Sequence, residues 1–523
     1  MADSVGMRNG IGLGIAGLLL LTTACSTGTA SSASGTGTIL LDSNFDTLDP
    51  ALTKSSTSIL VQGFLYDPLI HFDDRTGTIT SGLAQSWKFT STTAEFVLRD
   101  HVTCSDGSAF TVKTAARNLE RAKDPKVNAP FTASRMGTLG YQVSTDPATR
   151  TLRVKLDRPN SFLARGLAQM TMVCDSGLDS TGSLAAKADG TGPYTLKNYV
   201  PNQEFTLQLR KGYGWGSGGG TTAQAGLPTT LRLRLTADEN TAANLVLSHD
   251  AQAARFSAQT AKRFDGQDVT KVPDVSLTYL LNFNERAGHP TADPAVRRAL
   301  AQVVDSTAFT KVESQGTGTV PESLRAKGSL CLDPARTSPL IPSFDAKAAA
   351  AALEGDGWAR NAKGVWEKAG KTLSVRYLKG ETSDAGAEFL RKAWSDFGIA
   401  VKVDTTPVSQ SPAVLFAGTA WDVAIVTSGS PTPKNLDVLV NGPASPQGSN
   451  YPAIANKDYI AAAKAAMALP GNSSCPEWIK GEQALLKAVD VVPVAETSPV
   501  WIQSGIKFKL AGATINPLSL RVG

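Results

Sequence analysis

The chain of 523 residues is long enough for two or three domains, each with a core of its own. Hydrophobic residues make up 41% and charged residues 19% of the sequence, which is typical of a globular protein. The formal net charge of +5 is spread thinly, so the sequence contains no basic stripe of the kind that binds nucleic acid.

The first predicted element is an apolar run from Ile11 to Ala24. It contains Gly-x-Gly-x-x-Gly at Gly12, Gly14 and Gly17. A dinucleotide site needs a strand before that motif and a helix after it, and neither is predicted here. The run has 14 residues, whereas a membrane-spanning helix needs roughly 20. We therefore expect it to be neither a nucleotide loop nor a membrane span.

The length of the run fits the apolar part of a signal peptide over residues 1–24. The segment resembles a bacterial lipoprotein signal, in which Cys25 is acylated, although Thr22 stands where leucine is usual. Ordinary secretion with cleavage nearby is the alternative. Residues 25–37, rich in serine, threonine and glycine, are predicted to be a tether. We expect an extracytoplasmic protein, anchored through Cys25 to the outer face of the cell membrane.

From residue 38 onward, predicted strands and helices alternate without a repeat of fixed period. Residues 85–110 and 141–159 alternate apolar and polar side chains, which predicts antiparallel strands. Thr111 and the pair Asp293-Pro294 have the features of helix starts, and Asp345 begins a further helix. This mixture is typical of an α/β protein with several lobes.

Four cysteines follow Cys25. An even number in an oxidising compartment predicts two disulfides, and the sequence leaves their three connectivities open. No Cys-x-x-Cys pair occurs and the histidines are isolated, so no metal site is predicted. The four are Cys104, Cys174, Cys331 and Cys475.

No motif predicts catalysis, so we expect neither enzyme activity nor a cofactor. Gly370-Lys371-Thr372 lacks the earlier glycine of a phosphate loop and lies in a predicted hairpin. Ser504-Gly-Ile-Lys507 lies in a strand-like segment near the end of the chain, with no Lys-Thr-Gly after it. The tryptophans of periodic segments are predicted to be core residues, namely Trp87, Trp358, Trp366, Trp394 and Trp421.

Several stretches follow one another in an informative order. They include LDPAL, FLYDPLIHFD, GLAQSWKFT, EFVLRDHVTCSDGSAFTVKTAARNLER, VKLDRPNSFL, GTGPYTLKNYVPN and LNFNERAGHPTADPAVRRALAQVVD. Together they resemble the oligopeptide, dipeptide and nickel class of bacterial extracellular solute-binding proteins, family 5, which serve ABC importers. The resemblance runs from about residue 38 to the end. It implies an α/β, two-lobed periplasmic-binding-protein-like fold of type II, with an extra subdomain, that closes on a hinge.

The resemblance also implies how the chain divides. Two crossovers near Tyr279–Asn284 and Val492–Ser498 would form the hinge. Each disulfide would then lie within one lobe, as Cys104–Cys174 and Cys331–Cys475. The implied parts are lobe I at 38–65, 187–278 and 491–523, its inserted subdomain at 66–186, and lobe II at 279–490.

The implied function is capture of a peptide or peptide-like solute between the lobes and delivery to the permease and ATPase of an importer. We expect a monomer with no bound metal. Such a site needs backbone hydrogen bonds and one or two charged anchors rather than a nucleophile. The expected cleft residues are Thr53, Lys54, Ser55, Asn282, Phe283, Asn284, Thr427, Ser428, Gly429, Ser430 and Asn435.

One departure from the family pattern affects the expected ligand. Peptide-binding relatives commonly carry an aspartate after the strand corresponding to WDVAIV, which pairs with the amino terminus of the ligand. This chain has no acid between Asp422 and Asp437. An unpaired buried ammonium is costly. The expected ligand therefore has a blocked, acidic or neutral terminus, or is anchored by another acid such as Asp437. A different alignment of the loop is the alternative.

Two other functions are compatible with the sequence. One is a ligand-sensing lipoprotein that does not import its ligand. The other is an exported hydrolase on the same scaffold, which would need a nucleophile and a base in the cleft.

Overall fold

The computed structural model describes residues 35–42, 44–407, 410–429 and 431–522. The predicted signal peptide, Cys25 and most of the predicted tether lie outside these residues. Among the helices of the described part, none is long and apolar enough to cross a membrane.

The first sheet has seven strands. In spatial order they are β12 (Thr270–Pro273), β21 (Val500–Gln503), β11 (Ala253–Phe256), β1 (Thr36–Leu41), β10 (Thr230–Leu235), β9 (Glu204–Leu209) and β8 (Tyr194–Val200). The central strand β1 runs parallel to both β10 and β11. The carboxyl ends of these three strands therefore lie at one edge of the sheet.

Both faces of the first sheet are covered by helices, α1 (Ser56–Leu65) and α6 (Glu239–Leu247). Successive side chains of a strand point to opposite faces. Accordingly, Ile39 and Leu41 pack in the cluster that contains α1, whereas Leu40 packs in the cluster that contains α6.

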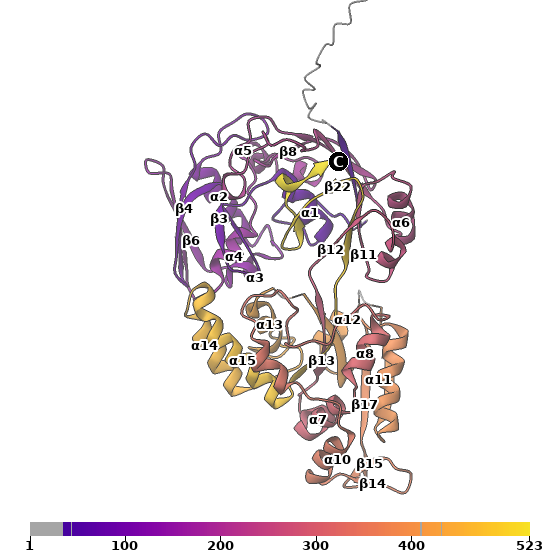
Figure 1. The fold of residues 1–523 in the computed structure, drawn as a ribbon. Coiled ribbons are helices and arrows are strands. Elements are labelled where there is room, and N and C mark those ends of the chain that lie inside the picture. The colour runs from indigo at the N-terminus through magenta and orange to yellow at the C-terminus, as the bar shows by residue number, and fades with distance from the viewer. Residues whose placement is uncertain (1–34, 43, 408–409, 430, 523) are drawn as a thin grey trace, which may run out of the picture. The chain divides into compact units, whose positions relative to one another are not determined.

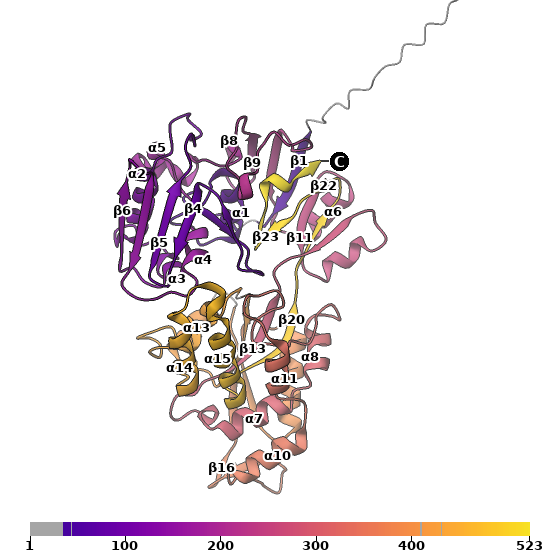
Figure 2. The same cartoon turned by 60° about the vertical axis from the view of Figure 1, so that its left-hand side comes forward.

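A subdomain is inserted between α1 and β8, around an antiparallel sheet (Figure 2). Its sheet has the order β4 (Ala84–Phe89), β5 (Thr93–Leu98), β7 (Thr151–Leu156) and β6 (Tyr141–Asp146), beside the hairpin of β2 (Ile70–Phe72) and β3 (Ile79–Ser81). Its helices are α2 (Val112–Lys123), α3 (Thr132–Met136), α4 (Leu163–Ala168) and α5 (Asp175–Asp179). Thr111 caps α2 as predicted, because its side chain accepts a hydrogen bond from Thr114 N at 3.2 Å. A disulfide joins Cys104 to Cys174, in the predicted pairing.

The second sheet has five strands. Their order is β18 (Ala400–Thr405), β17 (Ser374–Lys379), β19 (Val423–Ser428), β13 (Leu277–Phe283) and β20 (Val491–Thr497). β17 and β19 are parallel, whereas β13 is antiparallel to both β19 and β20. The carboxyl ends of β17, β19 and β20 therefore lie at the same edge as the amino end of β13.

Alternate residues of β13 pack against two groups of helices. Leu281 and Phe283 lie in one apolar cluster and Leu280 lies in another. The first cluster includes α7 (Pro294–Gln302), α8 (Ser306–Glu313), α10 (Ala346–Gly355) and α11 (Asp384–Asp396), and the second includes α13 (Pro433–Val440), α14 (Lys457–Met467) and α15 (Cys475–Ala488). Asp293 and Asp345 cap α7 and α10 as predicted. Trp366, Trp394 and Trp421 are fully buried.

The remaining elements are short. They are α9 (Pro334–Thr337), α12 (Ser411–Ala417), β14 (Ala359–Arg360), β15 (Trp366–Lys368), β16 (Lys371–Thr372), β22 (Ile506–Lys507), β23 (Leu510–Ala511), β24 (Thr514–Ile515) and β25 (Arg521–Val522). Lys371 and Thr372 lie in the antiparallel pair β15–β16, so no phosphate loop forms there. The second disulfide joins Cys331 to Cys475 at the start of α15, again in the predicted pairing.

The chain passes twice between the two sheets, at Asp274–Ser276 and at Ser498–Pro499 (Figure 1). The two passages lie side by side, because Asp274 N donates to Pro499 O at 2.9 Å and the Ser276 and Ser498 hydroxyls are 2.5 Å apart. The segments expected to cross, Tyr279–Asn284 and Val492–Ser498, mostly form β13 and β20 instead. The passages adjoin those strands, on the side nearer the first sheet.

A buried carboxyl group lies where the inserted subdomain meets the first sheet. Asp67 is 3% exposed and accepts hydrogen bonds from Tyr213 Oη at 2.8 Å, Thr191 Oγ1 at 3.0 Å and Trp215 Nε1 at 3.0 Å. Burial raises the pKa of Asp67 to about 6, despite these three donors.

This raised pKa predicts a measurable pH dependence of stability. Between about pH 4 and pH 6 the folded chain holds a proton on Asp67 that the unfolded chain has lost, so the contribution of Asp67 to the free energy of unfolding falls as pH rises. When Asp67→Asn is unfolded by chemical denaturant across pH 4–7, its free energy of unfolding should not show this fall with rising pH. Asp250→Asn, at an exposed site, should keep it. An unchanged pH slope in Asp67→Asn would show that Asp67 ionises normally.

Candidate functional site

The carboxyl edge of the first sheet contains a cavity of about 120 Å³. It is lined by Leu40, Leu41, Asp42, Thr236, Ala237, Glu239, Ala242, Ala254, Arg255, Phe256 and Ser257. In open α/β sheets, ligands bind in crevices outside the carboxyl ends of the strands. Glu239 in this cavity accepts hydrogen bonds from the hydroxyls of Ser257 at 3.1 Å and Thr260 at 2.8 Å, which fixes the segment after β11.

The loop after β1 contains three predicted site residues, and Asp46 holds it in place. Asp46 accepts hydrogen bonds from Thr53 Oγ1 at 2.7 Å and from Lys54 N at 2.6 Å. Partial burial alone would raise the pKa of Asp46, but these and other hydrogen bonds outweigh it and lower the pKa. Thr53 is buried, and Ser55 caps α1 by accepting from Ser58 N. Lys54 is the predicted residue of this loop whose side chain is exposed.

The edge of the second sheet next to the crossovers contains Thr427, which was predicted, and Glu381, which was not. Glu381 Oε2 accepts hydrogen bonds from both the backbone N and the Oγ1 of Thr427, each at 2.5 Å. Glu381 follows β17 and Thr427 lies near the end of β19. The parallel pairing of these strands brings the two residues together although they are 46 positions apart. The only sequence signal for Glu381 was an acid in the short segment that follows the predicted hairpin around Lys371.

The other predicted residues near β19 take different positions. Ser428 is buried and lies opposite Thr278, which in turn pairs with Glu496 of β20. Gly429 follows directly, and Ser430 lies outside the described residues. Asn435 lies in the first turn of α13, where its side chain accepts from Thr432 Oγ1 at 2.8 Å.

Asn282, Phe283 and Asn284 do not reach the edge next to the crossovers, contrary to the prediction. Phe283 is a core residue, and the side chain of Asn282 is buried between Leu280 O and Tyr451 Oη. β13 runs antiparallel to β19, so its carboxyl end lies at the opposite edge of the sheet.

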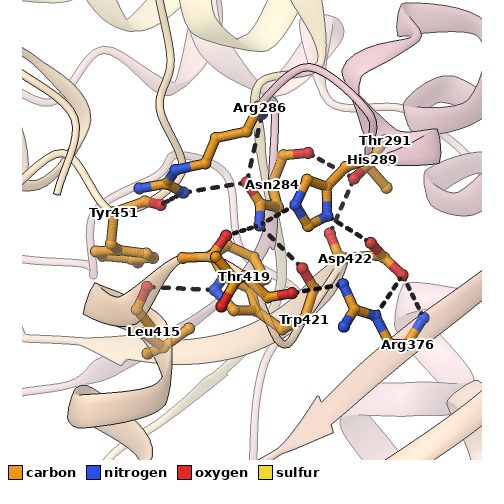
Figure 3. Close-up of polar contacts among 11 residues, drawn as sticks. Asn284, Arg286, His289, Thr291, Arg376, Leu415, Thr419, Trp421, Asp422 and Tyr451 are labelled. Atoms are coloured by element: carbon orange, nitrogen blue, oxygen red, sulfur yellow. Dashed lines mark hydrogen bonds and ion pairs between the residues drawn. The ribbon is translucent and has the colours of Figure 1, made fainter. Parts of the chain in front are cut away.

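At that opposite edge, Asn284 is the centre of a polar network (Figure 3). Its amide Nδ2 donates to Gly418 O and to Trp421 O, each at 2.9 Å, and its Oδ1 accepts from Arg286 Nη1 at 3.1 Å. Asn284 has no exposed surface. Its side chain therefore joins the end of β13 to the segment before β19 and is not free to bind a solute.

Asp422 completes this network. Its Oδ1 lies 2.6 Å from His289 Nδ1, and its Oδ2 accepts from Arg376 N at 2.7 Å (Figure 3). Thr291 Oγ1 donates to the backbone oxygens of both Asn284 and Asp422. Every side chain is engaged by its neighbours, which indicates a structural role.

Asp437, the alternative anchor suggested by the sequence, is also engaged. Its carboxylate accepts from Asn441 Nδ2 at 2.9 Å and Tyr459 Oη at 3.2 Å, inside the contact between α13 and α14. Asp437 is thus held by helix packing rather than presented at either sheet edge.

The two edges carry an excess of negative charge. Asp46, Glu239, Glu381 and Glu496 form no ion pair within the described part of the chain. Asp274 in the crossover is already paired with Arg255. Lys54 donates to Asp46, and Lys327 to Glu496, through the backbone N in each case. This balance favours a ligand that carries positive charge.

Comparison with known proteins identifies the family. Residues 78–450 match the model of the bacterial extracellular solute-binding proteins, family 5 (middle region). The chain belongs to this family. Its members are the substrate-binding components of ABC transporters, and they are not enzymes.

Individual relatives agree with this assignment. The chain is 26% identical to the nickel-binding periplasmic protein of Escherichia coli, over 68% of this chain and 66% of that protein. A substrate-binding protein of Microbacterium hydrocarbonoxydans, solved with 4-hydroxybenzoate hydrazide, superposes with a TM-score of 0.72 at 24% identity, covering 94% of this chain and all of the other. The oligopeptide-binding protein AppA of Bacillus subtilis, solved with a nonapeptide, gives 0.70 at 16% identity over 94% and 99%. The expected two-lobed α/β fold is confirmed.

The structural role of Asn284 gives a direct prediction. Asn284→Ala should lower the free energy of unfolding by about 2 kcal/mol or more, because it removes the buried donors to Gly418 O and Trp421 O. Asn198→Ala, at an exposed site on the edge strand β8, should change it by less than about 0.5 kcal/mol. Urea denaturation followed by circular dichroism measures both, and equal stability of the two variants would contradict this role.

Proposed function

We propose that the protein is the extracytoplasmic receptor of an ABC importer, and that it captures a peptide or peptide-like solute with a free amine between the carboxyl edges of its two sheets. It then delivers the solute to the permease, whose ATPase drives import. Family membership supports the receptor role. The position of Glu381 is the observation that supports a solute with a free amine.

Glu381 offers the negative group that the segment after β19 lacks. Both hydrogen bonds from Thr427 fall on Oε2, so the carboxylate is held in place at the edge of the second sheet. No lysine or arginine of the described residues pairs with it. An ammonium group that approached this edge would gain a charge-assisted hydrogen bond. The expectation of a blocked or neutral ligand terminus rested on a missing acid, and Glu381 replaces that acid from another strand.

The distribution of histidines favours a peptide over a bare metal ion. Among the described residues, no group of three histidine, cysteine or acidic side chains is arranged to hold a metal. His289 is engaged with Asp422 at the opposite edge of the second sheet, and the ring nitrogen Nε2 of His71 is buried in the inserted subdomain. Relatives include proteins solved with a nickel–histidine complex and with peptides. A peptide fits the edges of this chain better, because they supply carboxylates and no free imidazole.

The location of the protein forms part of the proposal. A receptor that hands its solute to a permease works best close to the membrane, which lipidation of Cys25 would ensure. Membrane fractionation of Cys25→Ala tests this, and we expect the variant to be released. Retention of the variant in the membrane fraction would contradict a lipid anchor at Cys25.

The role of Glu381 predicts a selective loss of affinity. Glu381→Gln keeps an oxygen that can accept from Thr427 but loses the charge. By calorimetry with a mixture of free-amine peptides, its affinity should fall roughly 10- to 100-fold, the range of one charge-assisted hydrogen bond. N-acetylated versions of the same peptides should bind both proteins equally.

The matched control is Glu354→Gln, at an exposed site on α10, which should bind like the parent protein. Equal affinity of Glu381→Gln and the parent protein for free-amine peptides would refute the proposed anchor.

A further inference from the structure

The two parts of the chain also touch away from the crossovers, where the inserted subdomain meets the helices of the second sheet. The turn at Ser161 and Phe162 contacts the turn between α14 and α15, and α14 lies next to the α3–α4 region in both views (Figures 1 and 2). Gly471 N donates to Ser161 O at 2.6 Å, and Trp478 Nε1 lies 3.4 Å from Ser161 Oγ. Asn472 Nδ2 also donates to Thr76 O at 3.0 Å.

Two phenylalanines of the inserted subdomain make apolar contacts across this interface: Phe162, which is buried, and Phe72, which is partly buried and packs against the same cluster. The side chain of Phe162 is 3% exposed and lies in the apolar cluster of the second sheet and its helices, with Leu280, Leu436 and Trp478. Every other buried member of that cluster comes from residues 280–491. The neighbouring Leu163, by contrast, packs in the core of the inserted subdomain. Phe162 therefore leaves its own subdomain and inserts into the core of another part of the chain.

The interface is incompletely packed beside Phe162. A largely apolar pocket of about 200 Å³, open to the surface, lies there, bounded on one side by Phe72, Phe89 and Leu163 and on the other by Pro470 and Gly471. Protein interiors are normally packed as densely as organic crystals. Atoms that line an open pocket lack contacts on one side, so this part of the interface holds less dispersion energy than a continuous core and separates more readily.

Because of the geometry of the crossovers, this contact must separate when the two sheets rotate relative to each other. Within the described residues, the chain connects the two sheets only at Asp274–Ser276 and Ser498–Pro499. A rotation about these short segments moves the inserted subdomain relative to α14 and α15. It must therefore break the hydrogen bonds at Ser161 and Asn472 and withdraw Phe162 from its pocket. A further hydrogen bond, from Lys434 Nζ on α13 to Ser134 O on α3 at 3.2 Å, also joins the two parts.

We propose that Phe162 is a reversible clasp, which favours the conformation in which the carboxyl edges of the two sheets approach each other. The clasp lowers the cost of enclosing a solute, because the enclosed conformation is already populated before binding. The proposal rests on the closure assumed in the proposed function. Its test needs no ligand, so the two can fail independently.

The test measures the distance between the inserted subdomain and α14 by pulsed electron spin resonance. Spin labels at Lys88→Cys and Lys464→Cys, both exposed sites, report this distance in the full chain with Cys25 replaced by serine. We expect one dominant distance in the parent protein. Phe162→Ala should add a longer and broader component that contains at least half of the population, and Phe162→Leu, which keeps an apolar plug, should restore most of the short one.

Two further variants make the result decisive. Phe344→Ala truncates a phenylalanine that is 58% exposed, and it should leave the distances unchanged. Asn472→Ala removes an exposed contact across the interface without a cavity, and it should shift the distribution in the same direction as Phe162→Ala, but less. A folded Phe162→Ala with the parent distribution would overturn the clasp. If Phe162→Ala does not fold, Asn472→Ala decides the question, and the parent distribution in that variant would overturn the clasp.

Discussion

The arrangement of the site depends on two short chain passages between two sheets. Asp274–Ser276 and Ser498–Pro499 run side by side, linked by the hydrogen bond from Asp274 N to Pro499 O. From the last residue of β12 to the first residue of β13 there are only three intervening residues, so the sheet edges lie within roughly 14 Å of each other there. The edges so joined are those with the carboxyl ends of β1, β10, β11, β17, β19 and β20.

That geometry explains why the chain needs few specialised residues. Strand ends present backbone groups and short polar side chains, and parallel pairing collects them at one place. Asp46 and Glu239 fix the segments of the first edge, and Glu381 fixes Thr427 on the second. These carboxylates have no cationic partners in the described part of the chain. In the proposed function they balance the positive charge of the solute, and a weak excess of negative charge at the site is compatible with a net charge of +5 overall.

Much of the fold could be predicted from the sequence. The N-caps Thr111, Asp293 and Asp345 are local signals, and the two disulfide pairings followed from the division into lobes that the family resemblance implies. The structure confirms both the caps and the pairings. The site was harder to predict because the residues of a strand do not show whether it runs parallel or antiparallel to its neighbours. Asn284 follows a strand just as Gly429 does, but β13 is antiparallel to β19, so the two residues lie at opposite edges. Glu381 was missed because its contact with Thr427 spans 46 positions and arises only from the pairing of β17 with β19.

The central claim is that solute binds at the joined carboxyl edges. Hydrogen–deuterium exchange of the full chain, with and without a saturating mixture of free-amine peptides, tests it most directly. The account predicts slower exchange in residues 44–55, 236–257, 380–383 and 426–429, with little change in residues 284–292, 418–422 and 445–451 around Asn284. Protection confined to the network of Asn284 and Asp422, with none at the joined edges, would contradict the account.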